Sequence, residues 1–176
     1  MKTNEVVVSV GTYEGGLMGL SASSSEIMTQ SKEKLKKEFS FVASTSQISC
    51  MASVQNLLAL GGTEEVIKLF DLKTKKSVGE LAGVHESSVT CLAISRNCKY
   101  VFSGAEDGLV VIWRVKDQEP LHQLKIKNVS KVVSLSMHNS GRMLLALYAN
   151  GMVRLWSMLD ARCIFKKKAG IDEDSE

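Results

Sequence analysis

The sequence is poor in several features that define other classes of protein. It has one proline and three histidines among 176 residues, and aromatic residues make up only 6% of it. No apolar run approaches the roughly 18 residues that a membrane-spanning helix requires. Residues 1–11 also lack the long apolar segment of a secretory signal peptide. We therefore expect neither a membrane span nor a cleaved leader.

The four cysteines do not follow a metal-binding pattern. Cys50, Cys91, Cys98 and Cys163 include no C-x-x-C pair, and no cluster of histidines accompanies them. We expect no metal and no cofactor. Cys50 and Cys91 occupy equivalent places in the repeat described below, where they suit the role of small buried apolar residues. Such cysteine usage is typical of a reducing, intracellular compartment.

The composition is that of a globular protein. Hydrophobic residues make up 44% of the chain and charged residues 23%, enough to bury a core. There are 22 lysines and arginines against 19 acidic residues, for a net charge of +3. This balance is too weakly basic to indicate a nucleic-acid partner by itself.

The chain repeats itself every 41 to 43 residues. Trp113 lies 43 residues after Phe70 and 43 before Trp156, and Gly104 lies 43 after Gly61. The clearest copy, 85–113, has three short apolar runs separated by polar turns, the second of which contains Asp-Gly. Short runs of this kind favour strands, and Asp-Gly favours a hairpin turn. The period and the strands are typical of a β-propeller blade.

Four side chains of this copy can satisfy one another's hydrogen bonds. If the second and third runs pair as strands, Ser103 and Trp113 lie beside one another. Asp107 then sits in their connecting turn, and His85 enters from the loop before the first run. The imidazole can bridge the hydroxyl and the carboxylate while the indole N–H finds an acceptor. We interpret these four residues as a structural tetrad.

The alternative interpretation of the same residues is a hydrolase triad. Ser103 lies in a predicted strand, however, and lacks the Gly-x-Ser-x-Gly turn that exposes a nucleophile. The sequence also has no phosphate-binding loop and no other nucleophile-base pair. We therefore expect the protein not to be an enzyme.

The other copies keep the tetrad only in part. The corresponding residues are Ser44, Leu60, Glu64 and Phe70 in the copy before, and Asn128, Ala146, Asn150 and Trp156 in the copy after. The first segment aligns on Gly11 and supplies only the second and third strands of a blade, with 39–41 as its outer strand. The polar residues 21–37 read as an exposed insertion.

These alignments predict an all-β, propeller-type fold of about four blades, the first incomplete. The expected blades are 1–42, 43–82, 83–126 and 127–165, followed by a charged, frayed tail at 166–176. Closed propellers have about four to eight blades, and a missing first strand would leave an unpaired apolar edge. We therefore interpret the chain as an open or truncated half of a seven-bladed propeller.

The motifs also resemble a known family. Trp113-Arg114 stands where WD repeats usually have Trp-Asp, and Val84-His85 stands where they have Gly-His. The strings at 11–20, 61–72 and 103–109 resemble the N-terminal half of the p21-activated-kinase-interacting WD protein family, relatives of yeast ribosome-assembly factors. The resemblance covers nearly the whole chain.

This resemblance implies a non-catalytic scaffold in biogenesis of the large (60S) ribosomal subunit, located in the nucleolus and nucleus. Its implied partners are proteins and pre-60S ribosomal particles, with possible contact to ribosomal RNA, and p21-activated kinase, which animal members regulate negatively. It implies no membrane and no small-molecule substrate. The alternative is a generic WD-repeat adaptor in signalling or ubiquitin ligation, which the identity of the partner would distinguish.

Two groups of basic residues are candidate partner contacts. Lys32, Lys34, Lys36 and Lys37 lie in and beside the polar insertion, where they suit either a phosphate backbone or ordinary solvation. Lys68 and Arg154 share one position of the repeat with Val111. We expect these three positions to line a common surface.

Overall fold

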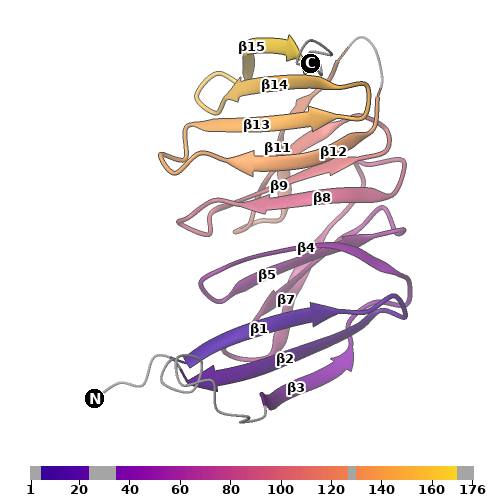
Figure 1. The fold of residues 1–176 in the computed structure, drawn as a ribbon, viewed down its shortest axis with the longest axis vertical. Coiled ribbons are helices and arrows are strands. Elements are labelled where there is room, and N and C mark those ends of the chain that lie inside the picture. The colour runs from indigo at the N-terminus through magenta and orange to yellow at the C-terminus, as the bar shows by residue number, and fades with distance from the viewer. Residues whose placement is uncertain (1–4, 24–34, 127–129, 170–176) are drawn as a thin grey trace, which may run out of the picture. The chain divides into compact units, whose positions relative to one another are not determined.

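The structure is a computed structural model that describes residues 5–23, 35–126 and 130–169. In these residues fifteen β-strands form four antiparallel sheets, and the same ranges contain no helix (Figure 1). The all-β class predicted from the sequence is therefore confirmed. The chain divides into two compact units, Met1–Ile48 and Ser49–Glu176.

The first unit contains a three-stranded sheet in the order β1-β2-β3. Its strands are β1 (Glu5–Gly11), β2 (Gly16–Ser23) and β3 (Lys36–Val42). Gly15 lies in the turn just before β2 and has a φ of +77°. A Cβ on Gly15 would lie 2.0 Å from the backbone oxygen of Ser44. Only glycine fits this turn, because both the backbone angle and the space exclude a side chain.

The second unit contains three four-stranded sheets, each of which follows the chain order. Their strands are β4 (Ile48–Val54), β5 (Leu57–Gly62), β6 (Ile67–Asp71) and β7 (Lys76–Leu81) in the second sheet; β8 (Val89–Ile94), β9 (Tyr100–Ala105), β10 (Val110–Arg114) and β11 (Glu119–Leu124) in the third; and β12 (Val132–Met137), β13 (Met143–Tyr148), β14 (Met152–Ser157) and β15 (Arg162–Lys168) in the fourth.

The last strand corrects the expected start of the charged tail. Lys166, Lys167 and Lys168 were placed in the tail, but they continue β15 and pair with β14. Ala169 extends this pairing through a hydrogen bond to the carbonyl of Gly151. Lysines suit this place because β15 is an edge strand, where charged side chains remain in solvent and oppose pairing with other chains. Residues 170–176 lie outside the described part.

Each sheet of the second unit has two different faces, because successive side chains of a strand point in opposite directions. We call the face that packs on the next sheet along the chain the forward face, and the opposite one the rear face. Forward and rear faces meet in two apolar cores. One contains Leu57, Ala59, Ile67, Leu69 and Leu81 against Val89, Leu92, Ile94, Val101, Leu109, Val111 and Trp113; the other contains Cys91, Phe102, Val110, Ile112 and Leu124 against Val132, Leu135, Leu144, Ala146, Tyr148 and Trp156.

Two glycines allow the sheets to approach closely. A Cβ on Gly61 would lie 2.8 Å from Cγ1 of Val89, and one on Gly104 would lie 2.5 Å from Cγ1 of Val132. Both distances are far shorter than a normal carbon contact of roughly 3.5–4.0 Å. The repeated glycine that defined the period in the sequence is therefore a packing residue on the forward face.

Candidate functional site: the His85 network and the repeats around it

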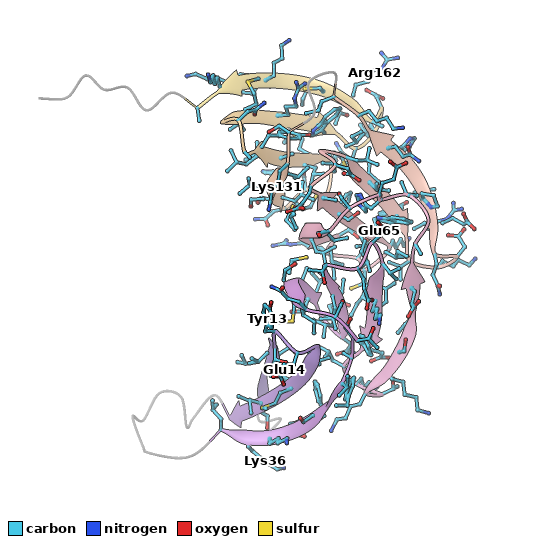
Figure 2. All side chains as sticks on the ribbon, turned by 90° about the vertical axis from the view of Figure 1, so that its right-hand side faces the viewer. Tyr13, Glu14, Lys36, Glu65, Lys131 and Arg162 are labelled. Atoms are coloured by element: carbon cyan, nitrogen blue, oxygen red, sulfur yellow. The ribbon has the colours of Figure 1, made fainter. Side chains whose placement is uncertain are left out.

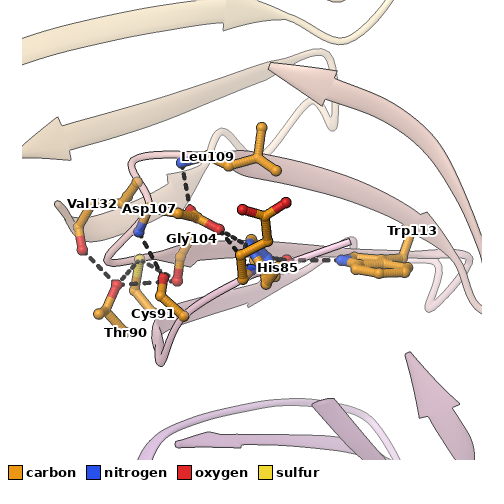
Figure 3. A network of polar contacts seen from close by, with 11 residues as sticks. His85, Thr90, Cys91, Gly104, Asp107, Leu109, Trp113 and Val132 are labelled. Atoms are coloured by element: carbon orange, nitrogen blue, oxygen red, sulfur yellow. Dashed lines mark hydrogen bonds and ion pairs between the residues drawn. The ribbon is translucent and has the colours of Figure 1, made fainter. Parts of the chain in front are cut away.

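Four side chains of the third sheet form a continuous hydrogen-bond network (Figure 3). Nε2 of His85 lies 2.7 Å from Oγ of Ser103, and Nδ1 of His85 lies 3.1 Å from Oδ2 of Asp107. Nε1 of Trp113 donates to Oγ of Ser103 at 2.7 Å. The structure brings together all four residues that the sequence singled out.

The strand register places two of these residues differently from the expectation. Ser103 on β9 lies opposite Val111 on β10, and Trp113 lies opposite Val101. Ser103 and Trp113 are therefore not direct neighbours; they are diagonal positions on the rear face. A long aromatic side chain can span such a diagonal, and the indole reaches along the sheet to the hydroxyl.

The partners decide where the hydrogens lie. Burial lowers the pKa of His85 below the usual value near 6.5, although Asp107 acts in the opposite direction. The imidazole is therefore neutral near pH 7. Its Nδ1–H donates to Asp107, so Nε2 accepts from the hydroxyl of Ser103, which in turn accepts from Trp113. Each of these buried donors has an acceptor.

Asp107 also holds two loops together. Its Oδ1 accepts the backbone N–H of Leu109 at 2.8 Å, and its Oδ2 accepts that of Glu86 at 3.3 Å. Its own N–H donates to Oγ of Ser87 at 2.8 Å. The carboxylate thereby joins the turn between β9 and β10 to the loop before β8. The network holds these two loops in place at one end of the sheet.

This geometry serves structure and not nucleophilic catalysis. Ser103 is fully buried, and its hydroxyl is used by both His85 and Trp113. A substrate carbonyl cannot reach an oxygen that lies inside the sheet packing, as acyl transfer would require. In the described residues no group of three or more His, Cys, Asp or Glu side chains is arranged to hold a metal ion.

The network lies inside a segment that matches a known family. The family described as WD domain, G-beta repeat matches residues 76–114, which include all four network residues. Residues 76–114 therefore match a WD repeat. The predicted fold class, WD-type propeller sheets, is confirmed by this match together with a structural one. Among solved structures, a chain of the "Crystal Structure of Mitotic Checkpoint Complex" matches 93% of this chain with a TM-score of 0.78 and 18% identity, and the match covers 48% of that chain.

Relatives in sequence match most of this chain. The "p21-activated protein kinase-interacting protein 1-like" of Xenopus laevis is 31% identical over 159 residues, 90% of this chain and 42% of that protein. "Protein MAK11" of Saccharomyces cerevisiae is 28% identical over 165 residues, 82% of this chain and 39% of that protein. The resemblance stated from the motifs is therefore confirmed. The chain spans about two-fifths of the length of these curated relatives.

The WD repeat of the fourth sheet replaces the tetrad with a different set. Ala146 takes the position of Ser103, and Nε1 of Trp156 makes no hydrogen bond of standard geometry within the part of the chain that the structure describes. Tyr148 takes the position of Ala105 and is buried, with its pKa raised to about 12 by desolvation. The 43-residue step from Ala105 leads to this tyrosine in the sequence, but tyrosine is not one of the four residue types of the tetrad.

Three buried hydrogen-bond donors lie on the rear face of the fourth sheet. Within the described residues, the hydroxyl of Tyr148, Nε of Arg154 and Nε1 of Trp156 are buried and make no hydrogen bond of standard geometry, although Trp156 lies close enough to Tyr148 to lower its pKa against the effect of burial. The guanidinium carbon of Arg154 lies 5.9 Å from the centre of the Tyr148 ring, a cation–π distance. The fourth WD repeat therefore packs by apolar and aromatic contact where the third uses hydrogen bonds. Asn128 lies outside the described residues.

We expected Lys68, Val111 and Arg154 to line a common contact surface, but the face that carries them is not free. The three do occupy one register position, but that position belongs to the rear face. Val111 is fully buried, and Arg154 is half-buried beside Tyr148. The side chain of Lys68 is only 19% exposed and lies 3.4 Å from Glu64. The period was read correctly, but the period does not tell which face of a strand is free.

The four lysines of the insertion divide into two pairs. Lys32 and Lys34 lie outside the described residues. Lys36 begins β3 and is exposed (Figure 2). Its Nζ lies 3.4 Å from the carboxylate of Glu38. Lys37 is also exposed and lies opposite Leu20 on β2.

The described residues contain no helix long and apolar enough to cross a membrane.

Proposed function

We propose that this chain is a non-catalytic scaffold in biogenesis of the large ribosomal subunit, acting in the nucleolus. The observation that carries the proposal is the similarity to the kinase-interacting WD proteins and to yeast MAK11 over 90% and 82% of the chain. This is the family whose motifs implied a ribosome-assembly role. The fold supports a docking role, because stacked sheets with a buried polar network form a rigid platform.

A basic edge on the fourth sheet supports contact with ribosomal RNA. Arg162, Lys166, Lys167 and Lys168 all lie on β15 and are exposed. Several cations along one edge strand suit a phosphate backbone, and binding by such contacts weakens as salt rises because counterions are released. The lysines that the sequence assigned to a tail thus become an ordered candidate contact. This assignment is part of the proposal.

The test is affinity purification of the tagged chain from its own cells, washed at low and at high salt, with proteins and RNA identified. We expect precursors of the large subunit at low salt and their loss at high salt. Replacing Lys166, Lys167 and Lys168 by serine should reduce the recovered precursor RNA. The matched control replaces Lys73, Lys75 and Lys76, three exposed lysines around the turn from β6 to β7, and should leave recovery unchanged.

Other outcomes of the same experiment contradict the proposal. Recovery of a ubiquitin ligase or signalling complex without ribosomal precursors would identify a generic adaptor. Recovery of chaperones alone would show that the chain does not fold by itself, and would contradict its action as a scaffold. Equal loss of RNA in both lysine variants would remove the role of β15 but leave the scaffold in place.

A second candidate function is binding and negative regulation of p21-activated kinase. The observation that favours it is the 31% identity to a protein named for interaction with that kinase. A binding measurement with purified kinase, followed by a kinase activity assay with and without the chain, tests it directly. Binding with reduced kinase activity supports the proposal, and no binding at micromolar concentrations contradicts it.

A further inference from the structure

The turn before the outer strand has the same backbone conformation in all three sheets of the second unit. Lys75, Gln118 and Ala161 occupy this turn with φ values of 58°, 63° and 52°, and each lies 43 residues from the next. A positive φ is uncommon outside glycine, so its recurrence at one spacing identifies equivalent positions. The side chains at this position can therefore be compared from one sheet to the next.

Gln118 reaches from the third sheet to the outer strand of the second. Its Nε2 donates to the carbonyl of Val78 at 3.3 Å, and its Oε1 accepts the N–H of Glu80 at 3.3 Å. Both backbone groups belong to β7, the edge strand of the second sheet. Gly79 lies between them, and a Cβ on Gly79 would overlap the amide of Gln118. The amide therefore pairs with the edge of β7 as the backbone of a further strand would.

The contact between the third and fourth sheets reverses these two residue sizes. Ala161 stands where the contact above has the glutamine, and His122 stands where it has the glycine. Alanine has no amide to reach the edge of β11, and the histidine has a Cβ where such an amide would lie. The corresponding backbone groups of β11 are the carbonyl of Leu121 and the N–H of Gln123. This edge therefore lacks the side-chain amide that pairs with β7.

A groove of about 310 Å³ lies between the third and fourth sheets at this place. Its walls include Tyr100, His122, Arg142, Met158 and Leu159, and Leu159 is 75% exposed although it is apolar. None of the described residues that line the groove is acidic. Arg142 also takes part in no ion pair within the described part of the chain. The groove thus combines apolar surface, a strand edge and an arginine whose charge an acidic ligand would complement.

We propose that this groove binds an extended segment of a partner protein that carries a large apolar residue beside an acidic one. The backbone of the segment pairs with the edge of β11. Gln118 is the reason to expect a peptide group there, because a side-chain amide and a backbone amide offer the same donor and acceptor. The apolar side chain lies against Met158 and Leu159, and the carboxylate faces Arg142. The inference goes beyond the proposed function, since it requires neither RNA nor a ribosomal particle.

The test selects random short peptides, displayed on phage, for binding to the purified chain. We expect the selected peptides to share a large apolar residue next to Asp or Glu. The double variant Ala161→Gln with His122→Gly reproduces the glutamine and glycine of the other contact, so its own amide should occupy the edge of β11. It should bind the selected peptides at least about tenfold more weakly, a loss of about 1.4 kcal/mol or more in binding free energy.

A second variant tests the charge without refilling the groove. Arg142→Glu should weaken binding of the same peptides, because like charges repel, and replacing the acidic residue of the peptide by lysine should restore it. The matched control is Lys99→Glu. Lys99 is exposed and lies 43 residues before Arg142, at the contact that Gln118 already fills, so this variant should bind like the unmodified chain. Circular dichroism must show that all variants are folded.

Three outcomes would overturn the proposal. One is a selection whose peptides bind the double variant as tightly as the unmodified chain, and another is a selection that yields no binding peptide. The third is an equal loss of binding in Arg142→Glu and Lys99→Glu, which would show general charge attraction in place of a defined contact. The assay contains only purified chain and peptides, so its failure leaves the proposed ribosomal role standing, and failure of that role does not change the peptide result.

Discussion

The indole nitrogen of Trp113 lies 2.7 Å from the hydroxyl of Ser103, whereas Trp156, 43 residues later, has Ala146 at the equivalent place and a buried nitrogen with no acceptor of standard geometry among the described residues. The same tryptophan thus occurs in two neighbouring WD repeats with opposite hydrogen-bond states. The third sheet gains a buried polar network, and the fourth relies on packing. Reciprocal substitutions at Ser103 and Ala146 measure this difference directly.

Ser103→Ala should lower the free energy of unfolding by about 1–3 kcal/mol, because it leaves the buried acceptor Nε2 of His85 and the buried donor Nε1 of Trp113 without their partner. Ala146→Ser supplies Trp156 with an acceptor and should raise it by about 0.5–1.5 kcal/mol. Urea unfolding followed by tryptophan fluorescence checks both. Ser140→Ala, on an exposed turn, is the control and should change little. Equal effects at Ser103 and Ser140 would contradict the role of the network.

Stability should depend on pH through His85. Burial lowers the pKa of His85 in the folded state, so below the unfolded value near 6.5 the unfolded chain binds a proton that the folded chain does not. Its contribution to stability is therefore complete above about pH 6.5 and is lost as pH falls from there through the lowered pKa. His85→Gln should have a flatter profile in this window when unfolding is measured at a series of pH values. An unchanged slope in the variant would assign the pH dependence to other groups.

Gly104→Ala should destabilise the second unit by about 1–3 kcal/mol, since the added methyl would overlap Val132 and force the third and fourth sheets apart. Val132→Ala removes the atom it would meet most closely. The double variant Gly104→Ala with Val132→Ala should therefore lose less stability than the sum of the single variants, as a double-mutant cycle measures. Strict additivity would show that the two positions do not touch.

The thiols of Cys50, which is half-buried, and Cys91, which is buried, should resist alkylation. Burial raises the pKa of Cys50 to about 12 and that of Cys91 to about 11, so little thiolate forms at pH 8. Iodoacetamide followed by peptide mass mapping should label Cys163 in the folded chain before Cys50 and Cys91. In denaturant all four cysteines should react alike. Labelling of Cys91 at the rate of Cys163 in the folded state would show that the third and fourth sheets separate readily.

The period, the strands and the network residues could be predicted from the sequence because they depend on local chemistry. Alternating apolar residues and an Asp-Gly turn favour a hairpin wherever they occur. His85, Ser103, Asp107 and Trp113 were identified because polar groups inside such a hairpin need one another. The glycine repeat was equally visible, although its reason, close approach of Gly104 to Val132, was not.

What only the tertiary structure decided is which face of each strand is covered. Lys68 and Arg154 occupy the same register position as Val111, as the period predicts. In the third sheet this position is buried against the neighbouring sheet, and the period alone does not show that. The lysines at 166–168 have the composition of a tail, but pairing with β14 makes them an edge strand. Alternation along a strand is a property of the sequence, whereas burial depends on the neighbouring sheet. That neighbour lies tens of residues away in the chain, so the sequence determined the sheets and their repeat, and the packing of one sheet on the next determined which residues remain free to bind.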